Sequence, residues 1–184
     1  MAGSARAGSF NTKLAHAAGR GASATGAEVT HVNLRDLALP LFDEDLEASQ
    51  GLPAGVKHLQ ALMRDHHGFI IASPEYNSSL TPMLKNAIDW ASRGDPPHAP
   101  LASFTGKVAA LYAASAGALG GLRGLVHLRA ILGNINVLVL PQQYALSRAH
   151  EAFDADGSLK DAKVRATVEA IAADLTRTIV KLRG

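Results

Sequence analysis

The sequence contains no cysteine. This absence excludes disulfide bonds, thiolate chemistry and cysteine-based zinc sites, and it fits a reducing compartment. No apolar run approaches the ~20 residues that a membrane-spanning helix needs. The first residues, Met1–Arg6, also lack the apolar segment of a secretory signal. We therefore expect no membrane partner and a cytoplasmic location.

Charge and metal-ligand patterns are also sparse. The formal net charge is only +2, and the basic residues are scattered, so we predict no nucleic-acid partner. The 8 histidines are spread along the chain, and the adjacent pair His66 and His67 cannot share a helix face as metal ligands do. Asp154–Gly157 resembles the start of a calcium loop, but the later ligands are not in register. We predict a turn there, and no metal site in the chain.

The chain has enough apolar residues for a core of its own. Its 184 residues are 47% hydrophobic, which predicts one domain spanning residues 1–184. Uniformly apolar runs, typical of strands buried on both faces, alternate with segments of helical periodicity. This alternation predicts a doubly wound α/β domain in three layers, with a parallel sheet between two layers of helices.

The expected elements follow from these runs and from the residues that break them. Strands are predicted at Glu28–Leu34, Gly68–Ala72, Lys107–Ala114 and Asn136–Pro141. The first predicted helix runs from Thr12 to Ala18 and is ended by Gly19–Gly21, and the second runs from Pro53 through Met63. A third is predicted from Pro82 to Ser92 with Thr81 as its N-cap, and a fourth from Gly121 to Leu132, closed by Gly133. The last predicted helix has one apolar face, formed by Val164, Val168, Ile171, Leu175, Ile179 and Leu182. Residues 37–45 are expected to form a surface loop, and Ser158 with Asp161 resembles a capping box.

One expected strand has almost no sequence to form it. A doubly wound fold that begins with a phosphate-binding loop has a buried strand before that loop. Here Met1 and Ala2 lead directly into Gly3 and Ser4. We therefore expect the first strand to be truncated or missing.

The loop Gly3–Thr12 has the composition of a phosphate cradle. Its glycines let backbone amides converge, and a helix begins directly after it. The loop adds the hydroxyls of Ser4, Ser9 and Thr12, the Asn11 amide and the Arg6 charge. It matches neither the Walker A loop nor the dinucleotide fingerprint. A disordered N-terminal segment is the alternative interpretation.

Two further polar loops follow the next strands. Pro74–Asn77 offers main-chain donors and acceptors beside an aromatic ring, which suits a planar heterocycle. The alternative is an ordinary strand-to-helix turn. Ser115–Gly121 follows the next strand. Since the carboxyl ends of parallel strands meet at one edge of the sheet, these loops predict a single ligand cleft.

At these motifs the sequence resembles the NAD(P)H-dependent FMN reductases of flavodoxin-like fold, a family that includes quinone and chromate reductases and azoreductases. The resemblance covers nearly the whole chain. It rests on Gly3-Ser4-x-Arg6-x-Gly8-Ser9-Phe10-Asn11, Pro74-Glu75-Tyr76-Asn77 with Leu84-Lys85-Asn86-Ala87-Ile88-Asp89-Trp90, Ser115-x-Gly117 with Gly120-Gly121, Leu128-Arg129-x-Ile131-Leu132, and Phe153-Asp154-x-Asp156-Gly157.

The resemblance implies an FMN cofactor and assigns residues to it. The phosphate would be held by Ser4, Ala5, Arg6, Ala7, Gly8, Ser9, Phe10 and Asn11, and the isoalloxazine ring by Pro74, Glu75, Tyr76 and Asn77, with Ser115 against the flavin. Hydride would pass from NADPH or NADH to flavin N5, and then to a small-molecule electron acceptor such as a quinone, free flavin or an azo compound. No protein residue would be catalytic. We interpret Glu75 as an exposed loop carboxylate beside the cofactor rather than a general base.

The resemblance also implies a homodimer or homotetramer, with the helix Pro82–Ser92 and its Trp90 as candidate contact surface. Two other functions stay open. A flavodoxin-type electron carrier would bind FMN without its own nicotinamide reaction, but such carriers are typically acidic and have a threonine-rich phosphate loop, whereas this chain is slightly basic and carries Arg6. A cofactor-free regulatory or scaffold domain is the second alternative. Nothing in the sequence distinguishes NADH from NADPH.

Overall fold

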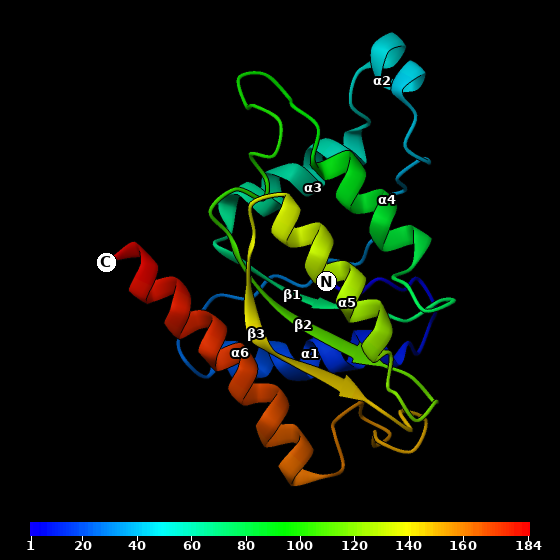
Figure 1. Ribbon diagram of the computed structural model, residues 1–184, viewed down its shortest axis with the longest axis vertical. Helices are drawn as coiled ribbons and strands as arrows, with labels where there is room; N and C mark the ends of the chain where they lie inside the picture. The colour runs from blue at the N-terminus through cyan, green and yellow to red at the C-terminus, as the bar shows by residue number, and fades with distance from the viewer.

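The computed structural model describes residues 1–184. Its core is a parallel sheet of β1 (Gly68–Ala72), β2 (Val108–Ala114) and β3 (Leu138–Leu146), hydrogen-bonded in the order β1-β2-β3. Figure 1 shows the strands side by side between helices. Every residue of β2 is buried, as expected for a central strand of a sheet covered on both faces.

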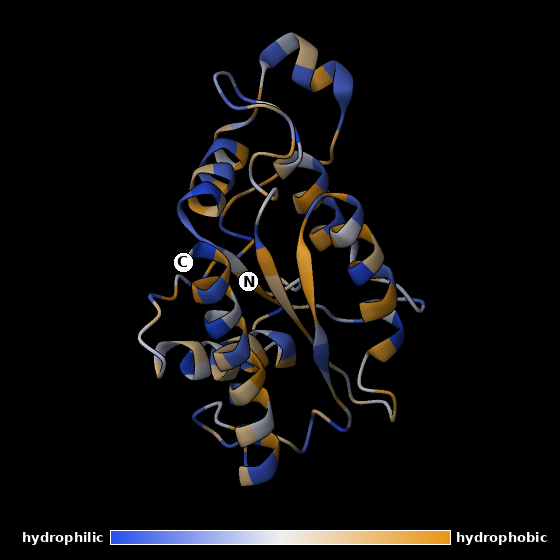
Figure 2. Ribbon diagram, turned by 60° about the vertical axis from the view of Figure 1, so that its left-hand side comes forward, coloured by the Kyte–Doolittle hydropathy of each residue, from blue (hydrophilic) through white to orange (hydrophobic).

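Helices cover both faces of the sheet. α1 (Phe10–Ser23) and α6 (Ala162–Arg183) pack on one face, where Leu14 and Val168 meet Tyr112 of β2. α3 (Ala54–Asp65), α4 (Pro82–Ala91) and α5 (Leu122–Asn134) cover the other face, and the short α2 (Glu44–Gln50) lies beyond them. Figure 2 shows the apolar strands between helices whose polar and apolar residues alternate around the axis. The predicted three-layer α/β architecture is confirmed. None of the helices is long and apolar enough to cross a membrane.

The residues before the first polar loop extend the sheet beyond β1. Met1 donates its terminal N–H to Ile70 C=O (2.8 Å), and Gly3 N–H donates to Ala72 C=O (2.9 Å). Ala2 also forms a parallel bridge with Asn33. The order in space is therefore Asn33, Ala2, β1, β2, β3, which is the flavodoxin-like order of doubly wound sheets. As expected, only Met1–Gly3 of the first strand pairs with β1.

The strand expected at Glu28–Leu34 does not form. This segment is extended, but its only ladder contact is the single bridge between Asn33 and Ala2. A strand needs a hydrogen-bonded neighbour along its length. Because the neighbouring position in the sheet is filled only from Met1 onward, the β-branched residues of this segment have no strand to pair with.

The glycines predicted to end the first helix lie inside α1, which runs from Phe10 to Ser23. Gly21 faces α6 so closely that a Cβ there would lie 2.3 Å from the Glu169 carbonyl oxygen. Gly19 lies against the His31 ring in the same way. These glycines permit close packing rather than terminating the helix.

Several other details of the elements differ from expectation. β3 runs to Leu146 and contains Pro141, which a strand at the edge of the sheet tolerates. α6 is capped by Asp161, which accepts N–H bonds from Lys163 and Val164, while Ser158 bonds Asp156 instead. Residues 37–45 form the expected loop only as far as Asp43, which caps α2. Leu182 is exposed, and α5 continues to Asn134.

Candidate functional site

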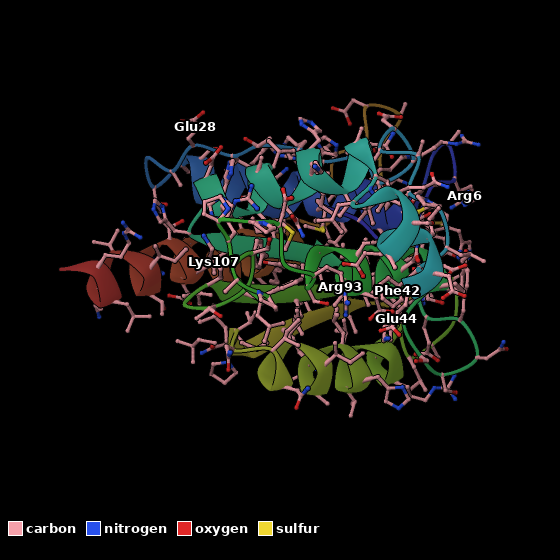
Figure 3. All side chains as sticks on the ribbon, turned by 90° about the horizontal axis from the view of Figure 1, so that it is seen from above. Arg6, Glu28, Phe42, Glu44, Arg93 and Lys107 are labelled. Carbon is pink, nitrogen blue, oxygen red and sulfur yellow. The ribbon has the colours of Figure 1, made fainter.

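The three predicted loops lie at the same edge of the sheet. Gly3–Ser9 follows Ala2, Ser73–Thr81 follows β1 and Ser115–Gly121 follows β2, and these strands are neighbours in the ladder. In Figure 3, Arg6 lies at one end of the molecule and Lys107, just before β2, lies towards the other end. Ligands of doubly wound folds bind at this carboxyl edge.

The first loop ends in the N-terminus of α1. Ser9 is the N-cap, and its Oγ accepts from the Thr12 N–H (3.3 Å). Gly8 makes the turn before it with φ of +70°, a left-handed conformation that favours glycine. The Arg6 guanidinium lies 5.2 Å from the centre of the Phe10 ring. Several backbone N–H groups donate to no protein acceptor, namely those of Ala5, Ala7, Gly8, Phe10 and Asn11.

This arrangement fits the phosphate end of FMN. Unpaired N–H groups at a helix N-terminus carry partial positive charge and bind anions. Arg6 adds a full positive charge that can hold a phosphate with two parallel hydrogen bonds. The added Cβ of a residue at position 8 would touch nothing within 4 Å, so the turn is open on its outer side.

Asn11 is placed differently from the other predicted phosphate residues. Its Nδ2 donates to Ala114 C=O (2.8 Å), and its Oδ1 accepts from Ala114 N–H (2.9 Å). The side chain is buried, and both its amide nitrogen and its amide oxygen are engaged by these bonds. Only the Asn11 backbone N–H faces the cradle. The side chain instead fastens the start of α1 to the end of β2.

The second loop contains a tight turn. Tyr76 and Ser79 exchange backbone hydrogen bonds of 2.9 and 3.0 Å, and the central residues Asn77 and Ser78 have φ of +49° and +67°. Two positive φ angles identify a type I′ turn, in which asparagine is favoured. The turn projects Tyr76, which is 55% exposed, from the carboxyl end of β1.

Thr81 joins the second loop to the first. It caps α4 by accepting from the Leu84 N–H (3.2 Å), as predicted, but its hydroxyl also donates to Gly3 C=O (2.6 Å). The second bond could not be foreseen, because it joins residues 78 positions apart. A Cβ at Gly3 would lie 3.0 Å from the Thr81 hydroxyl, so the chain approaches closely here.

Glu75 is not the exposed carboxylate that the sequence suggested. Its side chain is only 8% exposed and is paired with Arg123 (Nη2 to Oε1, 2.5 Å). Its Oε2 accepts N–H bonds from Arg123 (3.0 Å) and Gly124 (3.4 Å) at the start of α5. Burial raises the pKa of Glu75, but these hydrogen bonds and the Arg123 charge outweigh it and hold the pKa below its ordinary value. Glu75 therefore joins the second loop to α5 as an anion.

The third loop lies tightly over the end of β2. Ser115 N–H donates to Leu146 C=O (3.0 Å), and its Oγ accepts from the Gly117 N–H (3.1 Å). Gly120 and Gly121 have φ of +63° and +92°. A Cβ at Gly120 would lie 2.7 Å from the Ala145 backbone, so only glycine lets the loop approach β3 this closely.

Trp90 does not lie on a contact surface. Its side chain is completely buried, and its indole N–H donates to Pro40 C=O (2.8 Å). The Phe42 ring packs edge-on against it at 4.9 Å, and Figure 3 labels Phe42 close to Arg93 and Glu44. The proposed contact through Trp90 is therefore wrong, because the segment before α2 covers this side chain. Tyr112 is also buried, and its hydroxyl donates to Val168 C=O (3.1 Å).

The strand order and the three loops at the carboxyl edge define a flavodoxin-like α/β fold. Consistent with this fold, the chain superposes on an archaeal flavodoxin with a TM-score of 0.59 at 12% identity, covering 95% of this chain and 94% of that one.

The family follows from closer relatives. Residues 1–151 match the model of the NADPH-dependent FMN reductase family. The chain is 38% identical to an NAD(P)H-dependent FMN reductase of Pseudomonas aeruginosa, covering 100% of this chain and 95% of that protein. It is 39% identical to a quinone reductase of Escherichia coli over 76% of this chain and 71% of that protein. The structure of the flavoenzyme NAD(P)H:(acceptor) oxidoreductase of Paracoccus denitrificans superposes with a TM-score of 0.83 at 30% identity, covering 98% and 95% of the two chains. The chain belongs to the NADPH-dependent FMN reductase family.

Proposed function

We propose that the protein is an FMN-dependent NAD(P)H oxidoreductase that reduces quinones, free flavin, azo compounds or similar small acceptors. One observation carries the proposal. The loop with unpaired N–H groups at the start of α1 is fastened through Thr81 to the β1 loop and through Asn11 to the end of β2, directly before the third loop. The cradle that fits a phosphate and the aromatic turn that suits a flavin ring are thus held at one edge.

In this proposal the protein binds and orients its cofactor. FMN, when bound, supplies the hydride chemistry. Arg6 and the N-terminal amides of α1 hold the phosphate, and the backbone of Pro74–Asn77 with Tyr76 borders the ring. Ser115 anchors the third loop by its backbone and its hydroxyl. Glu75 is already paired with Arg123 and the α5 amides, so it has no role as a general base.

The experiment starts from the purified protein titrated with FMN. We expect a saturable flavin complex whose absorbance is bleached by NADPH or NADH without oxygen, followed by steady turnover with a quinone, with FMN and with an azo dye. Failure to bind FMN would reject the proposal. Binding without bleaching by either nicotinamide would favour the electron-carrier alternative.

A charge-removal pair tests the phosphate cradle. Arg6→Ala removes the cation beside the unpaired amides and is expected to weaken FMN binding about tenfold to a hundredfold, the usual worth of a hydrogen-bonded ion pair. Arg183→Ala is the matched control, because Arg183 is an exposed arginine at the far end of α6. Equal FMN affinity in the two variants would contradict the assignment of Arg6.

We also propose a homodimer or homotetramer, with a contact surface that differs from the one expected at Trp90. Leu122 and Val126 lie one turn apart on α5 and are 42% and 60% exposed. Apolar side chains exposed together are typical of interaction surfaces. Light scattering should give an oligomer that Val126→Asp weakens, whereas Val180→Asp on α6 should leave it intact. A monomeric parent protein would refute this assembly.

A further inference from the structure

A fourth loop lies at the carboxyl edge of the sheet, after β3. It runs from residue 147 to residue 160 and leads into Asp161, the N-cap of α6. Ala149 N–H donates to Ser115 C=O (3.0 Å), which joins the first part of this loop to the loop after β2. Because β3 neighbours β2 in the ladder, the β3 loop borders the same edge as the other three loops. No residue of the phosphate cradle or of the Tyr76 turn comes from it.

The second part of the β3 loop is a tight hairpin that fixes Phe153. Phe153 and Leu159 form an antiparallel bridge. Asp154 N–H donates to Ser158 C=O (2.9 Å), and Gly157 makes the turn between them with φ of +84°. The Phe153 side chain is only 9% exposed and packs into the core between α1, α6 and the sheet. The hairpin thus holds the Phe153 ring in one place against α1.

The Phe153 ring lies parallel to the ring of Phe10, the first residue of α1. The two ring planes differ by 3°, and the ring centres are 6.2 Å apart. The Arg6 guanidinium lies 5.2 Å from the centre of the Phe10 ring, and Lys13 Nζ lies 5.6 Å from the centre of the Phe153 ring. Aromatic rings at this spacing attract each other, and cations are attracted to ring faces. A continuous stack of side chains therefore leads from the β3 loop to Arg6.

The position of Arg6 depends on this stack. Arg6 is exposed, and its guanidinium makes no hydrogen bond or ion pair within the chain. Fixing a free arginine side chain costs conformational entropy, which would oppose binding of a phosphate. The Phe10 ring lowers this cost because it gives the guanidinium a flat surface beside the unpaired amides at the start of α1. Phe10 is itself only half-buried, so its ring relies on Phe153 to keep one orientation.

We propose that Phe153 is a positioning residue for the phosphate cradle, because through Phe10 it holds Arg6 where the guanidinium can meet the FMN phosphate. The inference rests on the proposed FMN site and makes the β3 loop a fourth component of that site. In this role Phe153 contacts neither the phosphate nor the flavin ring and acts only through the stack. Loss of its ring therefore weakens recognition of the phosphate and leaves binding of the isoalloxazine ring unchanged.

A comparison of two flavins isolates the phosphate. Riboflavin has the ring of FMN but no phosphate, so the Kd of riboflavin divided by the Kd of FMN measures recognition of the phosphate. We expect Phe153→Leu and Phe10→Leu each to lower this ratio about threefold, the usual worth of an exposed cation–π contact, with the riboflavin Kd unchanged. Phe153→Tyr keeps the ring and should keep the ratio. Phe104→Leu is the matched control and should also keep it, because Phe104 is a buried phenylalanine that packs against Phe69 on the other face of the sheet.

A double variant shows whether Phe153 acts through Arg6. If it does, adding Phe153→Leu to Arg6→Ala should lower the ratio no further than Arg6→Ala alone. A further loss of similar size in the double variant would overturn the inference. So would a parent-like ratio in Phe153→Leu while Arg6→Ala lowers it, and that result would leave the FMN site standing.

A measurement without flavin separates this inference from the proposed function. Protons above an aromatic ring are displaced upfield in NMR spectra by the ring current, so the side-chain protons of Arg6 report its contact with Phe10. We expect them upfield in the flavin-free parent and in Phe153→Tyr, and closer to those of an unstructured arginine in Phe153→Leu. Failure to bind either flavin would refute the proposed FMN site, and these shifts would still show whether Phe153 positions Arg6. Identical Arg6 shifts in the parent and in Phe153→Leu would overturn the inference whether or not flavin binds.

Discussion

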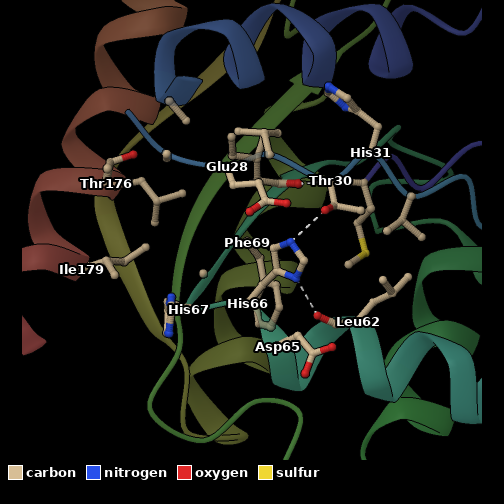
Figure 4. Close-up of a pocket in the computed structure, with 18 of the residues that line it drawn as sticks. Glu28, Thr30, His31, Leu62, Asp65, His66, His67, Phe69, Thr176 and Ile179 are labelled. Atoms are coloured by element: carbon tan, nitrogen blue, oxygen red, sulfur yellow. Dashed lines mark hydrogen bonds between the residues drawn. The ribbon is translucent and has the colours of Figure 1, made fainter. Parts of the chain in front are cut away.

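The two ends of the sheet are stabilised in different ways. At the carboxyl edge, side chains fasten each loop to its neighbour, with Thr81 bonded to Gly3, Asn11 to Ala114 and Glu75 to Arg123. At the amino end beside β1, the segment Ala27–Val32 faces an unpaired strand edge across an open groove of about 650 Å³, and the link across it is the bond between His66 and Thr30 (Figure 4).

This difference separates an edge whose loops are linked from an end that is left open. The carboxyl edge has its loops positioned before any ligand arrives, so little ordering entropy opposes binding there. The amino end still has unpaired backbone groups and an apolar groove. The two ends can therefore be tested independently. Variants that cut the links test the carboxyl edge, and changes at the Met1 amino group test the amino end.

The largest expected effect comes from Asn11→Leu. The leucine leaves both Ala114 N–H and Ala114 C=O buried without partners, and each orphaned group costs about 1–3 kcal/mol. We expect the free energy of unfolding to fall by about 2–4 kcal/mol, measured by chemical denaturation. Asn134→Leu is the matched control, since Asn134 is exposed at the end of α5 and its variant should stay within about 0.5 kcal/mol. Similar losses in both variants would show that the Asn11 bridge does not hold α1 to β2.

The buried Met1 amino group should make stability depend on pH. Its pKa falls from 8.0 to about 6 on folding, because burial disfavours the ammonium. Between these values only the unfolded chain holds the proton, so raising the pH through this window favours folding. We expect a gain of about 2–3 kcal/mol from below pH 6 to above pH 8, complete above the unfolded value.

Acetylation of the amino terminus separates this effect from other titrations. The pKa values of His16 and His31 are also lowered, first by burial and to a smaller extent by the charge of the amino terminus, but both rings titrate below their ordinary value of 6.5 and so outside the window from pH 7 to pH 8. The acetylated protein should lose the rise between pH 7 and pH 8. The same rise in both proteins would exclude Met1 as its source.

A smaller effect is expected at the link between the first two loops. Thr81→Val removes the hydroxyl that donates to Gly3 C=O and caps α4, which should cost about 1–2 kcal/mol. FMN affinity, measured by flavin fluorescence, should fall as well, because the phosphate loop loses its attachment. Thr81→Ser keeps the hydroxyl and should retain most of both properties. A serine variant as weak as the valine variant would show that the methyl group, not the hydrogen bond, matters.

Much of the fold could be predicted because its determinants are local. The apolar run Gly68–Ala72 and the Thr81-Pro82 cap each specify an element with little help from distant residues. The strand expected at Glu28–Leu34 does not form for the opposite reason. Its composition suits a strand, but the ladder beside it offers only Ala2 as a partner. Gly19 and Gly21 were misinterpreted because their role depends on His31 and α6 packed against them.

The site shows the same division. The motifs located its three loops, and those loops do lie at one edge, but the links between them could not be inferred from spacing. Asn11 was expected to face a phosphate, whereas its side chain meets Ala114, 103 residues further on. Trp90 was expected at a surface, and the segment around Phe42 covers it. Such pairings depend on tertiary packing, which leaves no periodic signal in the sequence.

The smallest effect is expected at Glu75. Glu75→Gln removes a charge that pairs with the largely exposed Arg123 and accepts from the first amides of α5, so solvent screening limits the loss to about 1 kcal/mol at pH 7. Because folding lowers the pKa of Glu75, the stabilisation is present above the unfolded value of 4.5 and is lost as the pH falls through the folded-state pKa. Parent and variant should therefore converge in acid when their unfolding is compared across pH. Glu169→Gln is the control, because the Glu169 carboxylate forms no hydrogen bond or ion pair, and it should match the parent throughout. A Glu75→Gln difference that persists unchanged in acid would mean that shape rather than charge joins the β1 loop to α5.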